Sequence, residues 1–305
     1  MPNQITHYYH GMAVMERLEG KAKEIVGSFP EIFKVGCIGP DIMFVIREIG
    51  GGDAKRYANE MQYLKMYEVF NEAVHFLKDN PDEAHIAYML GLLCHYVMDL
   101  RGHAYVNYFV EAVMPKYFPG NMQSALHPLL ESGLDEHILI DYLKVDPRIY
   151  SIGREFRTTR KDRKKISRIY AQVINDVIGF DVPEWKIRMA IMISRMFFFV
   201  TTDKSGRKKK MFDRRENRKG IKKQMSSSIR PPYLMGEYDF MNRKRIKWRK
   251  VRNMKSLTDE SFDMVIDDCI NKALLYIDNF LSALEGEKGL EKKDFTVNYE
   301  GVKVY

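Results

Sequence analysis

One segment of the chain carries three potential metal ligands at helical spacing. It reads His95-Tyr-Val-Met-Asp99-Leu-Arg-Gly-His103. Residues four positions apart lie on the same face of an α-helix, so the three side chains point in one direction if the segment is helical. Imidazole nitrogens and carboxylate oxygens are common zinc ligands, and burying such groups among apolar neighbours without partners is costly. The spacing therefore predicts a zinc site on a buried helix.

A second segment repeats part of this pattern. His127-Pro-Leu-Leu-Glu131 places a histidine and a carboxylate one turn apart, and Asp135 follows one turn later. In a chain of this composition, a histidine followed four residues later by an acid is expected about once by chance. Such pairs are therefore weak indicators alone, since a single histidine on an apolar face is more often a hydrogen-bonded core residue. The chain contains four of them: His75/Asp79, His95/Asp99, His127/Glu131 and His137/Asp141.

A third segment reads Gly36-Cys-Ile-Gly39-Pro40-Asp41. Its glycines and proline favour a tight turn, from which the Asp41 carboxylate would point inward from a loop. The same pattern also fits a helix N-cap, in which Asp41 would accept hydrogen bonds from backbone N–H groups. Both interpretations remain open from the residues themselves.

Helices are the elements expected to position these residues. Apolar residues recur at helical spacing, and no segment alternates with a period of two for long enough to predict a sheet. Glu83–Tyr108 is apolar around most of its surface, which is typical of a helix at the centre of a domain. Pro128 fits the first turn of a helix that continues to about Tyr142. The other predicted helices are Met12–Val26, Ala54–Leu77 (or a pair of helices there), Arg160–Val177, Val182–Val200 and Ser261–Leu284.

These elements predict an all-α fold. The 305 residues, of which 45% are hydrophobic, suffice for one large domain. We expect a single multi-helix bundle over residues 1–305, closed by a C-terminal helix at about 258–285. All eight histidines lie at or before His137, so any histidine chemistry is expected in the first half of the chain.

The net charge of +8 comes from one segment: Lys204–Lys223 contains eleven Lys and Arg against two acids. We expect a mobile basic insertion at about 203–230, because this stretch is polar and poor in apolar residues. It would be a solvated loop, or it would bind an anionic membrane or nucleic acid. The scarcity of aromatic residues favours lipid over single-stranded nucleic acid. Candidate phosphate or surface contacts are Lys208, Lys209, Lys210, Arg214 and Arg215.

No transmembrane segment is expected. The most apolar stretch, Ile187–Val200, is interrupted by Arg188 and Arg195, whereas a spanning helix needs roughly 18 uncharged apolar residues. The first residues lack the basic and apolar regions of a signal peptide, so we expect a cytoplasmic protein, with peripheral membrane contact as an option. The three cysteines form no C-x-x-C pair, which argues against a disulfide framework or a cysteine-ligated zinc.

Taken together, the motifs resemble the zinc-dependent phospholipase C family, in that family's order and at similar separations. The likeness covers nearly the whole chain apart from the basic insertion, and the distal part resembles the intracellular bacterial branch. The motifs are Thr6-His7 with Gly11, Gly36-x-x-Gly39-Pro40-Asp41, Gly91-x-x-x-His95-Tyr-x-x-Asp99-x-x-x-His103, His127-x-x-x-Glu131-x-x-x-Asp135, and Pro231-Pro232 with Tyr238-Asp239-x-x-Asn242 and Trp248.

The resemblance implies an all-α bundle of the phospholipase C and single-strand nuclease type, with up to three zinc ions. Asp135 would hold the ligands in place, and Asp41 would orient or deprotonate the attacking water. The implied ligands are Asp41, His95 and Asp99 for one ion, His103, His127 and Glu131 for a second, and His7 with a shared Asp99 for a third.

Two departures from the family affect the expected zinc content. The family has a further histidine ligand where this chain reads Glu60-Met61-Gln62, and Gln62 aligns best with that position. His75 is a potential substitute, although we expect it to be packed. The amino-terminal Trp of secreted members is also missing. We therefore expect two zinc ions, with a weakened first site and no complete third one.

The function implied by the resemblance is a zinc-dependent phosphodiester hydrolase, phospholipase C-like, that uses a metal-activated water on phospholipid. A nuclease or another phosphohydrolase on the same scaffold is the first alternative. The second is a non-catalytic helical binding protein with a degenerate metal site, which the amide at Gln62 would explain.

Overall fold

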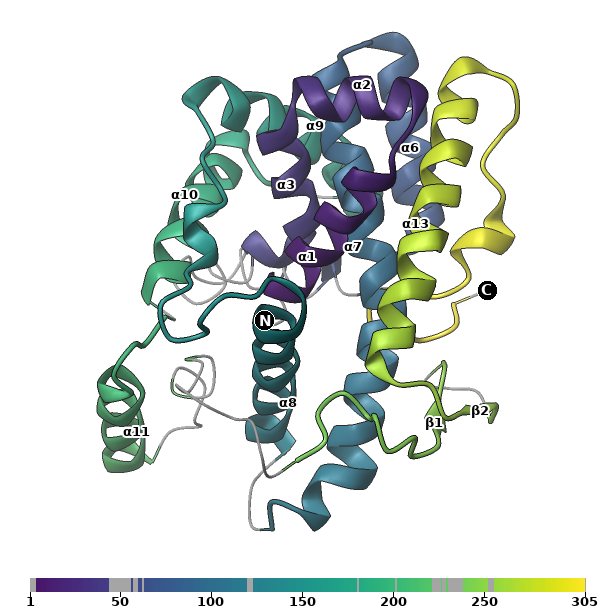
Figure 1. Ribbon diagram of the computed structural model, residues 1–305. Helices are drawn as coiled ribbons and strands as arrows, with labels where there is room; N and C mark the ends of the chain where they lie inside the picture. Colours follow the sequence, from purple (N-terminus) through teal and green to yellow (C-terminus); the bar gives the residue numbers. More distant parts are fainter. Residues whose placement is uncertain are drawn as a thin grey trace.

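The computed structural model of the chain describes residues 4–43, 63–119, 123–179, 181–200, 202–220, 238–251 and 255–304, together with 56, 60, 61, 226 and 229. Helices dominate this part of the chain (Figure 1). The helices are α1 (Gln4–Arg17), α2 (Gly20–Ser28), α3 (Pro30–Ile38), α6 (Met66–Asp79), α7 (Glu83–Tyr108), α8 (Gln123–His137), α9 (Arg160–Ile178), α10 (Glu184–Val200), α11 (Arg207–Lys219) and α13 (Phe262–Glu285). The strands are β1 (Trp248–Arg249) and β2 (Leu257–Thr258).

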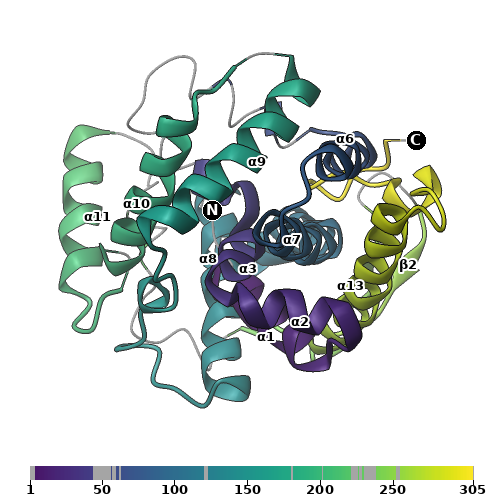
Figure 2. The same cartoon turned by 90° about the horizontal axis from the view of Figure 1, so that it is seen from above.

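Helix α7 forms the centre of the bundle and spans the residues predicted for it. Every residue from Ala87 to Gly102 is buried. Seen from above, α1, α2, α3, α6 and α13 surround it (Figure 2). The Asp82 side chain caps its first turn by accepting a hydrogen bond from the Ala84 N–H at 3.0 Å. Polar side chains on α7 therefore lie in the interior, where they need partners.

Two glycines allow α3 to lie directly against α7. Gly36 on α3 and Gly91 on α7 face each other, and a Cβ added to Gly36 would lie 2.3 Å from the Tyr88 carbonyl oxygen. A Cβ added to Gly91 would lie 2.2 Å from the Phe33 carbonyl oxygen. Neither position has room for a side chain, so the backbones meet because both residues are glycine. This contact brings the segment after α3 to the polar face of α7.

The first helical segment is divided, contrary to the single helix expected over Met12–Val26. Helix α1 ends at Arg17, and α2 begins at Gly20, whose φ of +50° lies in the left-handed region. Glycine adopts that conformation without strain. The chain then enters α3, for which no separate helix was predicted.

Helix α8 begins before the expected position. It starts at Gln123, so Pro128 lies inside the helix and not in its first turn. Proline removes one backbone hydrogen bond there. The helical course continues through a π-helical turn over Ile138–Tyr142, which matches the expected end.

The prediction of a loop over the basic segment was wrong. Residues Arg207–Lys219 form helix α11, which lies between Gly206 and Gly220. Both glycines have positive φ, which suits the ends of a short helix. The boundaries of an insertion at 203–230 and its mobility remain predictions. Gln62 and Pro231–Pro232 lie outside the described residues.

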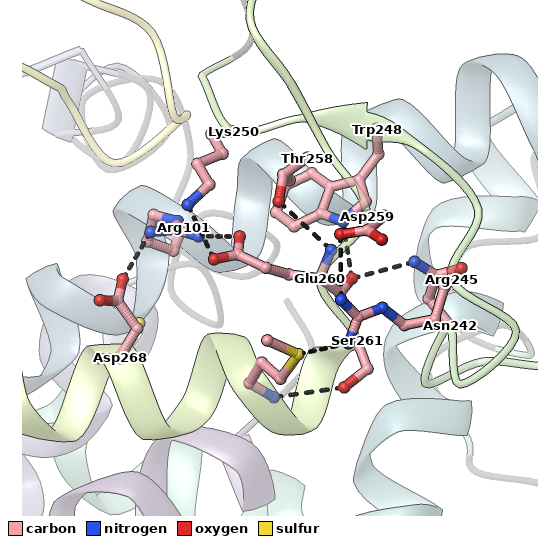
Figure 3. Close-up of polar contacts among 12 residues, drawn as sticks. Arg101, Asn242, Arg245, Trp248, Lys250, Thr258, Asp259, Glu260, Ser261 and Asp268 are labelled. Atoms are coloured by element: carbon pink, nitrogen blue, oxygen red, sulfur yellow. Dashed lines mark hydrogen bonds and ion pairs between the residues drawn. The ribbon is translucent and has the colours of Figure 1, made fainter.

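Helix α13 closes the bundle as expected, with Ser261 as its N-cap. Arg101 on α7 ties this region to the centre (Figure 3). Its guanidinium donates to the Asp268 carboxylate on α13 and, at 2.8 Å, to Glu260 ahead of the helix. The Glu260 carbonyl oxygen in turn accepts hydrogen bonds from Asn242 at 3.0 Å and from Trp248 at 2.9 Å.

The all-α prediction is confirmed. Strands β1 and β2 form an antiparallel ribbon with two residues in each strand, which is far too small to form a layer of the fold. Across the described residues, no helix is both long and apolar enough to cross a membrane.

The α3–α7 contact generates a stability prediction. We expect Gly91→Ala to lower the free energy of unfolding by about 1–3 kcal/mol, because the new methyl group would overlap backbone atoms. Gly102→Ala is the matched control in the same helix. Its methyl group would meet only the flexible end of Met98, at 3.4 Å, so it should stabilise by up to about 1 kcal/mol. Thermal and urea unfolding measure both, and equal effects would contradict this account.

Candidate metal centre

Helix α7 presents His95, Asp99 and His103 on one face, as their spacing predicted. The Asp99 Oδ2 lies 2.9 Å from His95 Nε2, and its Oδ1 lies 3.7 Å from His103 Nε2. Asp99 and His95 are buried, and His103 is partly exposed. The triple therefore opens towards solvent only at its His103 end.

Helix α1 adds His7 to this group. Its Nε2 lies 3.0 Å from Asp99 Oδ1, and its ring stacks on His95 with the centroids 4.2 Å apart. Next to it, the Thr6 N–H and hydroxyl donate to Asp135 Oδ1 at 3.0 and 2.8 Å. Asp135 on α8 thus fixes the first turn of α1 and the position of His7. Its carboxylate serves the ligands indirectly.

The last turn of α3 and the turn that follows it set the orientation of His95. The His95 Nδ1 hydrogen bonds with the Cys37 carbonyl oxygen at 3.1 Å, so Nδ1 carries the proton and Nε2 faces Asp99. Gly39 has a φ of +56°, and a Cβ added to it would lie 2.6 Å from the His95 ring. Glycine is required there for two reasons, backbone conformation and space.

Helices α7 and α8 build a second group from His103, His127 and Glu131. His127 Nε2 lies 2.9 Å from Glu131 Oε1. The His103 Nδ1 hydrogen bonds with the Tyr299 carbonyl oxygen, which leaves Nε2 facing the group. Tyr299 belongs to the segment after α13, and its ring also lies beside His95, with the centroids 5.5 Å apart.

The described residues thus contain two clusters that could each hold a metal ion: His7 with His95 and Asp99, and His103 with His127 and Glu131. Within each cluster, the offered ligand atoms lie within 4.8 Å of one another. Asp99 belongs to the first cluster, and its Oδ1 also approaches His103 of the second. The first cluster contains His7 where the resemblance implied Asp41.

Glu131 provides a test of whether a cation fits. Its side chain is fully buried, and His127 Nε2 lies 2.9 Å from its Oε1. Among the described residues, neither carboxylate oxygen has a hydrogen-bond donor in good geometry. A buried carboxylate with one histidine neighbour and no well-aligned donor is incompletely compensated, which carries an energetic penalty. A divalent cation among these oxygen and nitrogen atoms removes that penalty, so the residues present fit zinc.

The charges of the site are strongly coupled. Burial would raise the pKa of Asp99, but the charges of His103, His95 and His7 outweigh it and hold this pKa well below its usual range. Burial lowers the pKa of His103, but the charge of Asp99 dominates with help from Glu300 and Glu131, and the pKa rises to about 9. Asp99 is therefore an ionised carboxylate throughout the ordinary pH range.

Asp41 lies at the end of a 3₁₀ turn, Gly39–Asp41, in agreement with the turn interpretation of the sequence. Its carboxyl is buried and interacts electrostatically with His95, Asp99 and His7. Burial raises its pKa, and the charge of His95 opposes the rise. Asp41 is thus placed next to the first cluster.

Other predicted residues have different positions. His75 is exposed on α6 and not packed as expected, because it lies on the solvent side of that helix. His137 lies 3.1 Å from Asp141, which also accepts from Arg243 at 2.8 Å, so this pair belongs to a separate ion-pair network. The basic candidates Lys208, Lys209, Lys210, Arg214 and Arg215 lie on α11.

Sequence reasoning missed the groups that orient the ligands. Cys37 and Tyr299 act through backbone carbonyls, which every residue possesses, so no residue type could mark them. Thr6 was noted in a motif, but its bond to Asp135 joins positions 129 residues apart in the chain.

The Tyr299 contact generates a prediction for metal affinity. Gly301 has a φ of +70°, and a Cβ added to it would lie 2.9 Å from the Ala104 backbone nitrogen. We expect Gly301→Ala to shift this segment from α7 and release His103, weakening one zinc site by about 10–100-fold. Gly289→Ala, where the methyl group meets nothing within 4 Å, is the control. Zinc titration with a competing chelator measures both, and unchanged affinity in Gly301→Ala would refute the role of Tyr299.

A comparison with protein families found a match. The model of the family described as zinc dependent phospholipase C matches residues 5–179, which is more than half of the chain. The matched region includes every residue of both candidate clusters. Neither the curated proteins nor the solved structures contain a match. On the family match, the chain belongs to the zinc dependent phospholipase C family.

Proposed function

We propose that this protein is a zinc-dependent phosphodiester hydrolase of the phospholipase C type. The observation that carries the proposal is the pair of candidate ligand clusters, in which Asp99 lies between the two groups and, among the described residues, Glu131 has no ion-pair partner outside its own cluster. Two metal ions held at such a pair supply an activated water and offset the charge on the phosphoryl oxygens.

The proposed ligands divide between the two clusters. His7, His95 and Asp99 would hold one zinc ion, and His103, His127 and Glu131 a second. Because His7 already completes the first cluster, we propose two ions and no third. The hydrogen bonds from His95 to Cys37 and from His103 to Tyr299 keep each Nε2 available as a ligand.

Asp41 is the proposed catalytic base. It lies beside the first cluster, and burial raises the pKa of its carboxyl. A carboxylate whose pKa is raised towards neutrality is a better proton acceptor than an ordinary one. Its role would be to orient the attacking water and take its proton. Asp135 would contribute by fixing α1, through Thr6.

Phospholipid is the proposed substrate, in keeping with the family. We also propose contact with an anionic membrane surface through the basic residues of α11. The three cysteines are free and buried, which suits a reducing compartment such as the cytoplasm.

The experiment combines metal analysis with turnover. We expect about two zinc ions per chain and hydrolysis of a soluble phosphocholine diester that a chelator abolishes. His95→Ala and Glu131→Ala should each lower kcat/KM by about a thousandfold or more, since each removes a ligand of a different ion.

His75→Ala is the control, because His75 is an exposed histidine outside both clusters. Turnover retained in His95→Ala would refute the assignment of the site. Hydrolysis of single-stranded DNA in place of the phosphocholine diester would reassign the substrate to nucleic acid. Fewer than two zinc ions, with no turnover on either substrate, would indicate a non-catalytic binding protein.

A further inference from the structure

Helix α10 has an unusual solvent face. Surface helices of globular proteins normally direct charged residues to solvent and apolar residues to the core. In α10, every residue that is more than about a third exposed is apolar. They are Trp185 (53% exposed), Met189 (36%), Met192 (51%), Met196 (67%), Phe199 (42%) and Val200 (42%).

These residues form a continuous stripe. From Trp185 to Phe199, successive members lie three or four positions apart, which places them on one side of the helix over its full length, and Val200 extends the stripe at its end. The opposite side, with Ile187, Ile191 and Phe198, is buried, and α10 packs there against α9. The helix therefore has two apolar sides, one of which none of the described elements covers.

Lys186 Nζ lies 5.8 Å from the centroid of the Trp185 ring at one end of the stripe, and the arginines of α10 flank the stripe without covering it. Arg188 donates to Glu184 on the same helix at 2.9 Å, and Arg195 donates to the Gly153 carbonyl oxygen at 3.1 Å. Both arginines are partly buried and held in these contacts. Scattered exposed apolar residues are ordinary, but a contiguous exposed apolar face marks an interaction site.

The next helix brings positive charge to the end of this stripe. Figure 1 places α10 at the edge of the molecule, with α11 beyond its C-terminal end. The Lys208 side chain donates to the Thr202 carbonyl oxygen at 2.9 Å, two residues after α10. Helix α11 has eight basic residues and two acidic ones in its 13 residues.

One side of α11 forms an open, basic hollow, in which Met211 is the apolar member at 58% exposure. Across the described residues, the six cations of this hollow form no ion pairs. They are Arg207, Lys210, Arg214, Arg215, Arg218 and Lys219. A surface with so many unpaired cations attracts anions.

We propose that the exposed face of α10 and the basic side of α11 together form a docking surface for an anionic lipid bilayer. The apolar stripe would insert among the acyl chains near the headgroups, and the cations would contact lipid phosphates. This surface deepens the proposed function by naming the interface where the enzyme meets its substrate. A bound nucleic acid would explain the cations of α11, but it would leave the apolar stripe of α10 exposed to solvent. A lipid bilayer would contact the cations and the apolar stripe together.

The test is binding of the zinc-loaded protein to vesicles of phosphatidylcholine alone and of phosphatidylcholine with about a third phosphatidylserine, measured by co-sedimentation on ice to limit turnover. We expect binding to the anionic vesicles that weakens as salt rises. Arg207→Gln combined with Arg218→Gln should weaken it about 30-fold, because each cation near an anionic leaflet contributes roughly fivefold. Met196→Gln should weaken it roughly fivefold or more.

Matched controls lie elsewhere on the molecule. Lys23→Gln combined with Lys247→Gln removes the same charge from exposed positions of α2 and of the segment before β1. Leu275→Gln replaces an apolar residue of 56% exposure on α13, which lies across α7 from α10 in Figures 1 and 2. Both controls should bind anionic vesicles as the unmodified chain does.

Equal binding by the α10, α11 and control variants would overturn the proposal, as would the absence of binding to anionic vesicles. Binding to single-stranded DNA that depends on Arg207 and Arg218 but not on Met196 would assign α11 to nucleic acid and also overturn it. Hydrolysis of the soluble phosphocholine diester by the same variants should be unchanged. Turnover of the soluble diester tests the proposed function, and binding to vesicles tests the docking surface. The two proposals can therefore fail independently of each other.

Discussion

The ionised carboxylate of Asp99, buried in the middle of the central helix, sets the main constraint on this fold. A buried charge is tolerated only when other groups compensate it, and here three histidines do so from α1 and α7. Each of those histidines must in turn be held at its other nitrogen or against a neighbouring ring. The contacts of Cys37 with His95 and of Tyr299 with His103 meet this need. The arrangement of α1, the turn after α3 and the segment after α13 therefore follows from one carboxylate.

Close backbone packing makes that arrangement geometrically possible. Gly36 and Gly91 bring α3 onto α7 without intervening side chains. As a result, the Cys37 carbonyl oxygen reaches His95, and Gly39 fits beneath its ring. On the far side, Arg101 draws Glu260 and Asp268 towards α7, so the helix is fixed from two directions (Figure 3). On α7, the residues that pack the helix against its neighbours, Gly91 and Arg101, therefore lie within a few positions of the candidate ligands His95 and Asp99.

The sequence predicted most of what depends on residue type and spacing. Helix α7 was predictable because its apolar residues surround it, and His95, Asp99 and His103 shared a face because helical geometry requires it. The break at Gly20 was missed because glycine is tolerated within helices. The predicted start of α8 was too late, because Pro128 was assigned to the first turn and proline also occurs inside helices. The polarity of the basic segment predicts a loop where α11 lies. However, Lys and Arg are good helix formers, and Gly206 and Gly220 mark the ends of this helix. Backbone carbonyl partners and long-range pairs such as Thr6 with Asp135 have no signature in a single sequence.

The contact between Tyr299 and His103 has a consequence for biosynthesis. His103, His127 and Glu131 are all translated within the first half of the chain, but the carbonyl group that orients His103 belongs to residue 299. During translation, the residues of the second cluster are therefore present for more than half of the elongation time without the contact that orients the His103 ring. Metal binding at this candidate cluster would then be a late event, which follows the emergence of the distal segment from the ribosome. A nascent chain contains all three residues of the cluster well before it contains the residue that orients one of them.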